Sequence, residues 1–218
     1  EDKLKEGVES TRAISGNAVL LDVTDGSIKA MANFPTYDPN AYDKVTDQKL
    51  FINNAVTGAW EPGSVLKPLF IATALNENKI NTNFSYFDAG YVQVQDRRIT
   101  NALNYGAQTM TVADILKKSL NTGAVTVLRQ FGNGEITLQA REIWYKYLVE
   151  KYQFGKATGV EQNGEAAGYV AKPDEGDAQD VRYANMAFGQ GMTVTPLQIA
   201  ASYVALANGG VYYKPHLV

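Results

Sequence analysis

The chain has 218 residues, a length that suits one domain of ordinary size, and 45% of them are hydrophobic, which is enough for a core. A net charge of −3, from 20 basic and 23 acidic residues, excludes a dedicated basic surface for nucleic acid. Without cysteine there can be no disulfide, cysteine zinc site or thiol nucleophile, and one histidine cannot form a metal-binding cluster. We therefore expect neither a metal nor another cofactor.

The N-terminal part of the chain predicts a lead-in and a β-hairpin. Residues 1–14 are charged and weakly periodic, and we expect a helical or extended lead-in from a preceding region. The apolar runs Asn17–Val23 and Ser27–Asn33 flank Thr24-Asp25-Gly26, and Asp-Gly is a strong signal for a tight turn. Prolines and asparagines then break regular structure up to about residue 40.

The rest of the chain is predicted to be mostly helical. Ser64–Asn78 is apolar nearly all round, which indicates a buried helix, and Pro68 is tolerable only in a first turn, so the helix should start close to Ser64. Capping signals or apolar periodicity predict further helices from Thr111 to about Lys118, after Asn121, over Glu135–Tyr152 and from Thr195 to Asn208. The predicted elements are thus one hairpin and these helices. Two strands are too few to cover a buried helix, so strands are missing from this set.

Ser64-Val65-Leu66-Lys67 is the first candidate for chemistry. A serine hydroxyl is a poor nucleophile until a base removes its proton, and a lysine can do so if burial lowers its pKa. Three residues apart on a helix, the two side chains share a face, and the helix dipole favours negative charge at the first turn. The alternative is an N-cap serine with a snorkelling lysine. Against it, Lys67 lies in a stretch so apolar that its amine would be buried with no obvious carboxylate beside it.

Ser119-Leu120-Asn121 is the second candidate, because it falls where one helix should end and another begin. Its hydroxyl could relay a proton and its amide could hold a substrate carbonyl; the alternative is a capping serine. Ser15-Gly16-Asn17 has the same spacing, and we interpret Ser15 as a turn residue before the first strand.

Other features rank lower as sites. Phe188-Gly189-Gln190-Gly191 follows no predicted strand and carries no Lys-Ser/Thr, so it does not fit a phosphate cradle. His216 has no partner in the pattern, which favours a surface or structural role. The aromatic stripe of Trp144, Tyr145 and Tyr147 favours helix packing over a ligand site.

Together these segments resemble the transpeptidase domain of class B penicillin-binding proteins. Ser-x-x-Lys with Ser-x-Asn is the signature of that superfamily, and five stretches follow the family's order, at residues 17–40, 58–68, 110–124, 154–161 and 188–210. The resemblance covers residues 15–218. It implies an α+β fold of the penicillin-binding and β-lactamase-like type, with a helical cluster around a buried helix packed on an antiparallel sheet.

The resemblance also implies an activity, a D,D-transpeptidase that cross-links peptidoglycan stem peptides ending in D-Ala-D-Ala and is acylated by β-lactam antibiotics. Ser64 would attack the carbonyl between the two D-alanines, and Lys67 would take its proton. Ser119 would help pass that proton to the leaving D-alanine, while Asn121 would bind Lys67 and the substrate amide. The family also implies a membrane anchor before Glu1, a place on the extracytoplasmic face of the bacterial membrane, and a glycosyltransferase and other cell-wall assembly proteins as partners in cell shape or division.

Three departures from the family pattern matter. Leu120 stands where serine is common and Asn54 where arginine is common, and the third motif, Lys-Thr/Ser-Gly, is absent. Lys156-Ala157-Thr158-Gly159 imitates this motif but falls in a stretch that belongs to another part of the family pattern. We expect the genuine motif, three further strands and one of two oxyanion-hole donors beyond Val218. The chain would then be a lead-in, residues 1–14, and a partial domain, residues 15–218, with weak activity or none.

Two alternative functions stay open. A serine β-lactamase or β-lactam sensor shares the nucleophile and the lysine, although the stretches DPN, EPGS and FGQGMTVTP favour the cross-linking enzymes. Deacylation separates the two classes, because a lactamase releases penicillin quickly whereas a transpeptidase stays labelled. The other alternative is that the chain as given is an inert partial domain or a binding module.

Overall fold

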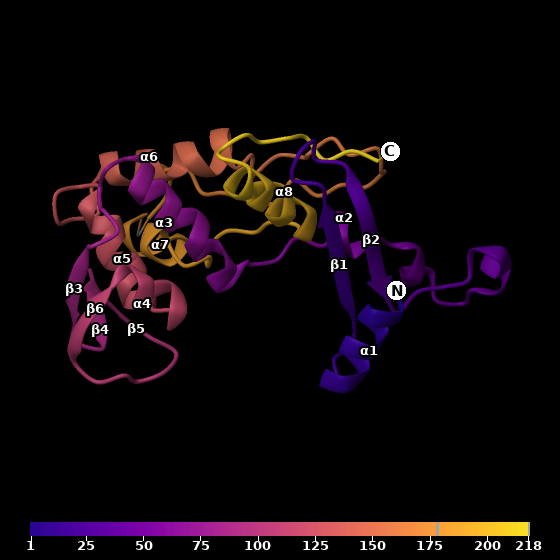
Figure 1. Ribbon diagram of the computed structural model, residues 1–218, viewed down its shortest axis with the longest axis horizontal. Coiled ribbons are helices and arrows are strands. Elements are labelled where there is room, and N and C mark those ends of the chain that lie inside the picture. The colour runs from indigo at the N-terminus through magenta and orange to yellow at the C-terminus, as the bar shows by residue number, and fades with distance from the viewer. Residues whose placement is uncertain (178, 218) are drawn as a thin grey trace. The chain divides into compact units, whose positions relative to one another are not determined.

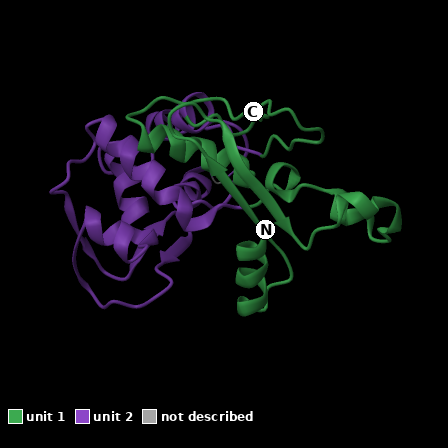
Figure 2. Ribbon diagram, turned by 45° about the vertical axis from the view of Figure 1, so that its right-hand side comes forward, with its two compact units in different colours: residues 1–60, 152–168, 194–218 green, residues 61–151, 169–193 purple. Residues whose placement is uncertain are grey.

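The computed structural model describes residues 1–177 and 179–217, in which helices and antiparallel strands are mixed (Figure 1). The chain forms two compact units, each built from separate segments (Figure 2). The first unit comprises residues 1–60, 152–168 and 194–218, and the second comprises residues 61–151 and 169–193. The strands pair antiparallel, which confirms the α+β class. None of the helices in the described ranges has the length and hydropathy to cross a bilayer.

The first unit is built on the predicted hairpin. Its elements are α1 (Asp2–Thr11), β1 (Gly16–Leu21), β2 (Ile28–Phe34), α2 (Asn54–Thr57) and α8 (Pro196–Ala207), with 3₁₀ turns at Pro39–Lys44 and Gln48–Phe51. The β1–β2 register runs from Gly16 opposite Phe34 to Leu21 opposite Ile28, with an irregularity between Leu20 and Leu21. Helix α8 packs on β1, and the core consists of Val56, Val160 and Leu197 against Val19, Leu21, Ile28 and Met31.

Helix α8 begins where the sequence predicts. Thr195 and Gln198 form a capping box, each side chain bonding the other's backbone N–H, and Pro196 occupies the first helical position, where its missing N–H costs nothing. The Gln198 amide also donates to the carbonyls of Lys156 and Ala167, so the start of α8 holds the loop between them.

The second unit contains the other helices and two small sheets. Its helices are α3 (Lys67–Asn76), α4 (Val112–Lys117), α5 (Asn121–Gln130), α6 (Leu138–Lys146) and α7 (Gln179–Met186). Strand β3 (Ser85–Asp88) pairs with β6 (Gln108–Thr111), and β4 (Tyr91–Val94) pairs with β5 (Arg97–Thr100). Helix α3 is buried as predicted, with Phe70 stacked on Phe131 and edge-on to Trp144. Trp144 of the aromatic stripe therefore serves helix packing, as predicted.

Four strands and two helices were not predicted. Strands β3 to β6 have four residues each, and at most two of the four are buried, so they carry too few alternating apolar positions to show period two. Strands β3 to β6 form two separate two-stranded sheets and do not pair with the hairpin, so the three further strands expected beyond Val218 stay a prediction. Helices α2 and α7 also escaped prediction, because α2 is a single turn of four residues and only Tyr183, Ala184 and Met186 of α7 are buried, so neither shows a long apolar stripe.

Two predicted helices have other boundaries. Residues Gly63–Leu66 form a 3₁₀ turn, η3, and α3 begins only at Lys67. Pro68 explains this: it has no N–H to donate to the Ser64 carbonyl, and the Lys67 N–H takes that carbonyl in a 3₁₀ bond. The predicted Glu135–Tyr152 helix is α6, capped by Thr137, followed by a π turn at Tyr147–Lys151. Apolar periodicity does not distinguish an α turn from a π turn.

Candidate active site

Ser64 lies exposed on the η3 turn, immediately before α3. The turn is made possible by Gly63, whose φ of 60° is in the left-handed region that side chains with a Cβ disfavour. The Gly63 N–H donates to the Gly189 carbonyl at 2.8 Å. Two residues on, the Gly191 N–H donates to the Glu61 carboxylate at 2.8 Å. The 188–191 segment, which the sequence left without a role, therefore holds both sides of the nucleophile turn.

Lys67 is the first residue of α3 and is 1% exposed. Its Nζ lies 3.0 Å from Ser64 Oγ. It also lies 2.8 Å from the Ser119 carbonyl oxygen, 3.0 Å from Ser119 Oγ and 2.8 Å from Asn121 Oδ1. All four partners are uncharged oxygens. Burial lowers the pKa of Lys67 from 10.5 to about 8, so a substantial fraction of the amine is neutral near physiological pH.

The second motif is presented by the junction between α4 and α5. Ser119 has a φ of 55°, and this left-handed residue directs both its carbonyl and its hydroxyl toward Lys67 Nζ. Leu120 is fully buried, and its N–H donates to the Ile115 carbonyl, which anchors the junction in the core. The apolar residue at the centre of the motif is thus a packing residue.

The Asn121 amide is held in one orientation. Its Nδ2 donates to the Thr100 carbonyl at 3.1 Å, so its Oδ1 is the atom that faces Lys67 Nζ. The sequence contained no signal for the Thr100 contribution. Every residue carries a backbone carbonyl, so the residue type cannot indicate which carbonyl holds Asn121. Ser64, Lys67, Ser119 and Asn121, predicted from separate motifs, are brought together within one unit.

The neighbouring oxygens determine which positions around Lys67 Nζ carry hydrogens, because some of them can only accept a hydrogen bond and others belong to hydroxyl groups. The Ser119 carbonyl and Asn121 Oδ1 can only accept, and they lie closest, so they take two N–H hydrogens of the amine. The remaining position, the lone pair of a neutral amine, faces the two hydroxyls, Ser64 Oγ and Ser119 Oγ, each at 3.0 Å. The arrangement can therefore take a proton from one hydroxyl and exchange it with the other.

Other candidates from the sequence lie elsewhere. Lys156–Gly159 forms a loop of the first unit, where the N–H groups of Thr158 and Gly159 donate to Glu165, so this imitation of the third motif is not on a strand. His216 pairs with Ile28 through its backbone, in agreement with a structural role. Ser15 directly precedes β1, as predicted, although it is not itself part of a turn. No group of three His, Asp or Glu side chains that could hold a metal occurs within residues 1–177 and 179–217.

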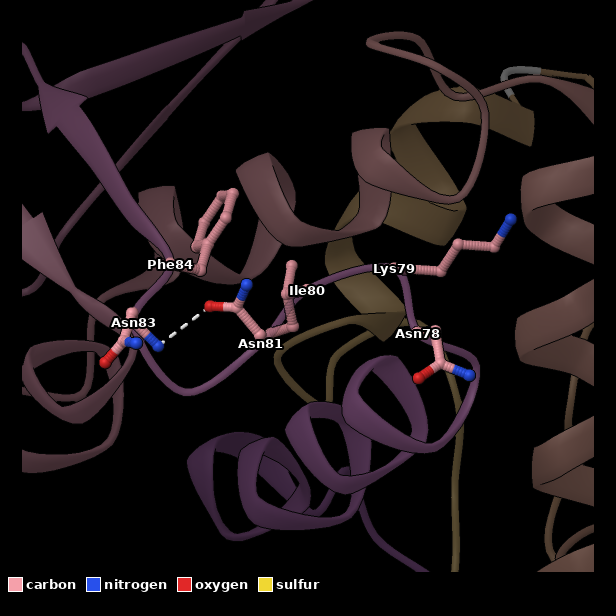
Figure 3. Close-up of a pocket in the computed structure, with 6 residues that line it drawn as sticks. All are labelled: Asn78, Lys79, Ile80, Asn81, Asn83 and Phe84. Atoms are coloured by element: carbon pink, nitrogen blue, oxygen red, sulfur yellow. Dashed lines mark hydrogen bonds between the residues drawn. The ribbon is translucent and has the colours of Figure 1, made fainter.

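A hollow of about 490 Å³ lies in the connection from α3 to β3 (Figure 3). It is lined by Asn78, Lys79, Ile80, Asn81, Asn83 and Phe84. Figure 3 shows the one charged side chain among them, that of Lys79, directed away from Phe84. None of these lining residues is a serine or a carboxylate, so the hollow contains no counterpart of the Ser64–Lys67 pair.

Comparison with known proteins agrees with this geometry. Residues 16–218 match the family model described as the penicillin binding protein transpeptidase domain. The chain is 31% identical over 222 residues to the peptidoglycan D,D-transpeptidase FtsI homolog of Mesostigma viride, which covers 98% of this chain and 36% of that protein. It is 32% identical over 213 residues to the peptidoglycan D,D-transpeptidase FtsI of Escherichia coli, which covers 96% of this chain and 33% of that protein. The chain thus spans about a third of the length of these relatives.

A solved structure shows the same fold. The crystal structure of penicillin binding protein 3 from Mycobacterium tuberculosis, complexed with aztreonam, matches with a TM-score of 0.88 at 28% identity. The match covers 99% of this chain and 46% of that chain.

Proposed function

The chain belongs to the family of penicillin-binding protein transpeptidase domains, and we propose that it carries the acyl-transfer site of a peptidoglycan D,D-transpeptidase. The observation that carries the proposal is the contact of 3.0 Å between Lys67 Nζ and Ser64 Oγ. A lysine that is buried, has a pKa of about 8 and points its free position at a serine hydroxyl is suited to act as a general base.

In the first half-reaction, Lys67 takes the Ser64 proton while Ser64 Oγ attacks the carbonyl between the two D-alanines. The C–N bond breaks, the serine becomes an ester, and the proton passes through the Ser119 hydroxyl to the amine of the leaving D-alanine. In the second, the amine of a neighbouring stem peptide attacks the ester. Its proton returns to Ser64 Oγ through the same groups, and the new amide is the cross-link. Asn121 holds Lys67 throughout and can accept a hydrogen bond from the substrate amide.

β-Lactams contain a strained amide in place of the D-Ala-D-Ala bond, and their opened ring stays attached as the acyl group. We therefore propose Ser64 as the residue that a β-lactam acylates. For the whole protein we propose a membrane-anchored enzyme on the extracytoplasmic face of the bacterial membrane. Its partners would be a glycosyltransferase and other cell-wall assembly proteins.

The test is covalent labelling by a fluorescent penicillin. Both the 218-residue chain and the longest chain that the gene encodes are labelled, each as wild type, Ser64→Ala and the control Ser15→Ala. We expect the long chain to be labelled, the short chain weakly or not at all, Ser64→Ala to lose the label, and Ser15→Ala to keep it. Labelling that persists in Ser64→Ala refutes the assignment, and release of the label within seconds identifies a β-lactamase instead.

A further inference from the structure

A buried carboxylate, Asp88 at the end of β3, lies behind the second motif. It is 2% exposed. Its Oδ2 accepts hydrogen bonds from Thr122 Oγ1 at 2.7 Å, Asn101 Nδ2 at 2.9 Å and the Tyr86 hydroxyl at 3.3 Å, and its Oδ1 accepts one from the Gly90 N–H at 2.8 Å. Burying a carboxylate is costly unless donors surround it in this way, and the sequence motifs assign it no role.

Two of these donors adjoin the groups that orient Asn121. Thr122 follows Asn121 at the start of α5. Asn101 follows Thr100, whose carbonyl accepts the hydrogen bond from Asn121 Nδ2. Asn101 Oδ1 also accepts the Thr122 N–H at 3.1 Å, which joins the two segments directly. Asp88 therefore ties together both stretches of chain on which the orientation of the Asn121 amide depends.

The neighbouring phenol supports this arrangement. Burial raises the pKa of Tyr86, its bond to Thr122 opposes that shift, and the charges of Asp88 and Asp114 add to it. The phenol consequently stays protonated and can donate to Asp88. Every polar atom named in the cluster has a partner, as a buried network needs in order to hold one geometry.

We propose that Asp88, acting through Asn101 and Thr122, is a positioning residue that holds Asn121 Oδ1 against Lys67 Nζ. The inference rests on the proposed function in that Lys67 is taken as the base. If Asp88 no longer gathers its donors, Asn121 can turn away and the Lys67 ammonium loses an acceptor. A hydrogen bond to the charged form favours that form, so its loss lowers the pKa of Lys67 further below about 8.

The decisive variant is Asp88→Asn. The amide has the size of the carboxylate, but its NH₂ group is a donor and must replace one of the two accepting oxygens. In one orientation it faces the Gly90 N–H, and in the other it faces the donors that converge on Oδ2, so a hydrogen bond is lost either way. The exchange Asp88→Asn with Asn101→Asp supplies a rescue. It restores one carboxylate and one amide to the cluster, and a carboxylate at position 101 can still accept from both the N–H and the hydroxyl of Thr122.

Three properties are measured for each variant: the Lys67 pKa by carbon-13 NMR of labelled lysine in the 218-residue chain, acylation by fluorescent penicillin in the longest encoded chain, and thermal unfolding. In Asp88→Asn we expect a lower Lys67 pKa. Well above pH 8, where the amine is neutral in the wild type as well, acylation should be slower by about tenfold or more because Asn121 no longer holds the amine in place, and the double exchange should restore both properties. The control Asp180→Asn breaks the ion pair with Arg141 in the same unit. It should lower stability and leave the Lys67 pKa unchanged.

If the role of Asp88 is purely structural, Asp88→Asn lowers stability as the control does and leaves both the Lys67 pKa and the acylation rate unchanged. That outcome overturns the proposal. If Asp88→Asn does not fold, Thr122→Val removes one donor at nearly constant size, and it must shift the Lys67 pKa downward for the proposal to stand. If the wild type is not labelled at all, the proposed function fails, while the Lys67 titration still decides whether Asp88 positions Asn121.

Discussion

Gly189→Ala should slow acylation strongly, because a methyl group at this position collides with the nucleophile turn. A Cβ on Gly189 would lie 2.0 Å from the Gly63 carbonyl oxygen and 2.6 Å from the Gly63 carbonyl carbon and nitrogen. Ordinary contacts begin near 3.4 Å, so one backbone must move by more than an ångström. Gly63 adjoins Ser64, and a displacement of about 1 Å in a reacting group can reduce its rate about 10²-fold.

A matched control separates this collision from backbone strain. Gly209 has a φ of 87°, close to the 85° of Gly189, but nothing lies within 4 Å of a Cβ built on it. Alanine at either position costs about 1–2 kcal/mol for its left-handed conformation. The control Gly209→Ala should therefore lower the free energy of unfolding by that amount and acylate at the wild-type rate. Gly189→Ala should lose at least as much stability and acylate about 10²-fold more slowly.

The assay is the rate of labelling by fluorescent penicillin in the longest encoded chain, paired with denaturant unfolding of the same samples. Measuring the two together matters, since a variant that is mostly unfolded would also label slowly. If folded Gly189→Ala acylates as fast as Gly209→Ala, the 188–191 segment does not position Ser64 and the steric reasoning is wrong.

Two further predictions follow from the Lys67 pKa of about 8. Because only the neutral amine can take a proton, the acylation rate should fall about tenfold for each pH unit below 8 and level off above pH 8. Stopped-flow labelling measures this rate. A flat profile below pH 8 would contradict Lys67 as the base. Lysine in the unfolded chain keeps its proton up to about pH 10.5, so between pH 8 and 10.5 the unfolded chain binds more protons than the folded chain. Across that range the free energy of unfolding of the wild type should therefore rise by about 3 kcal/mol relative to that of Lys67→Met. Denaturant unfolding across that range should show no such gain if the amine stays charged in the folded state.

The elements predicted well are those with a local signal. The capping boxes at Thr111 and Thr195 lie within four residues of sequence, and both helices begin where those residues predict. Strand β3 differs, because it is short and pairs with β6, from Ser85 opposite Thr111 to Asp88 opposite Gln108. Only Tyr86 and Asp88 of β3 are buried, and one of them is charged, so no hydrophobic pattern marks the strand.

The residues of the site also differ in whether a local sequence signal marks them. The spacing of Ser64 and Lys67 predicted a shared face, although the prediction assumed an α-helix. In the structure they span a 3₁₀ turn, in which residues three apart eclipse one another, so the contact is more direct than α geometry implies. The sequence could not indicate Asp88, because it reaches the site only through pairing with β6 and through hydrogen bonds to residues 13 and 34 positions away.

The placement of charge explains why the lysine can serve as a base. A carboxylate in contact with Lys67 would hold the ammonium charged and raise its pKa, whereas the carbonyl, amide and hydroxyl oxygens around Nζ satisfy its hydrogen bonds without a full countercharge. Burial then decides the pKa, and it favours the neutral amine. The buried carboxylate of the second unit, Asp88, contacts residues beside the motif, and its charge is met by neutral donors. In this proposal Asp88 holds Asn121 Oδ1 against Lys67 Nζ without itself forming an ion pair with the lysine.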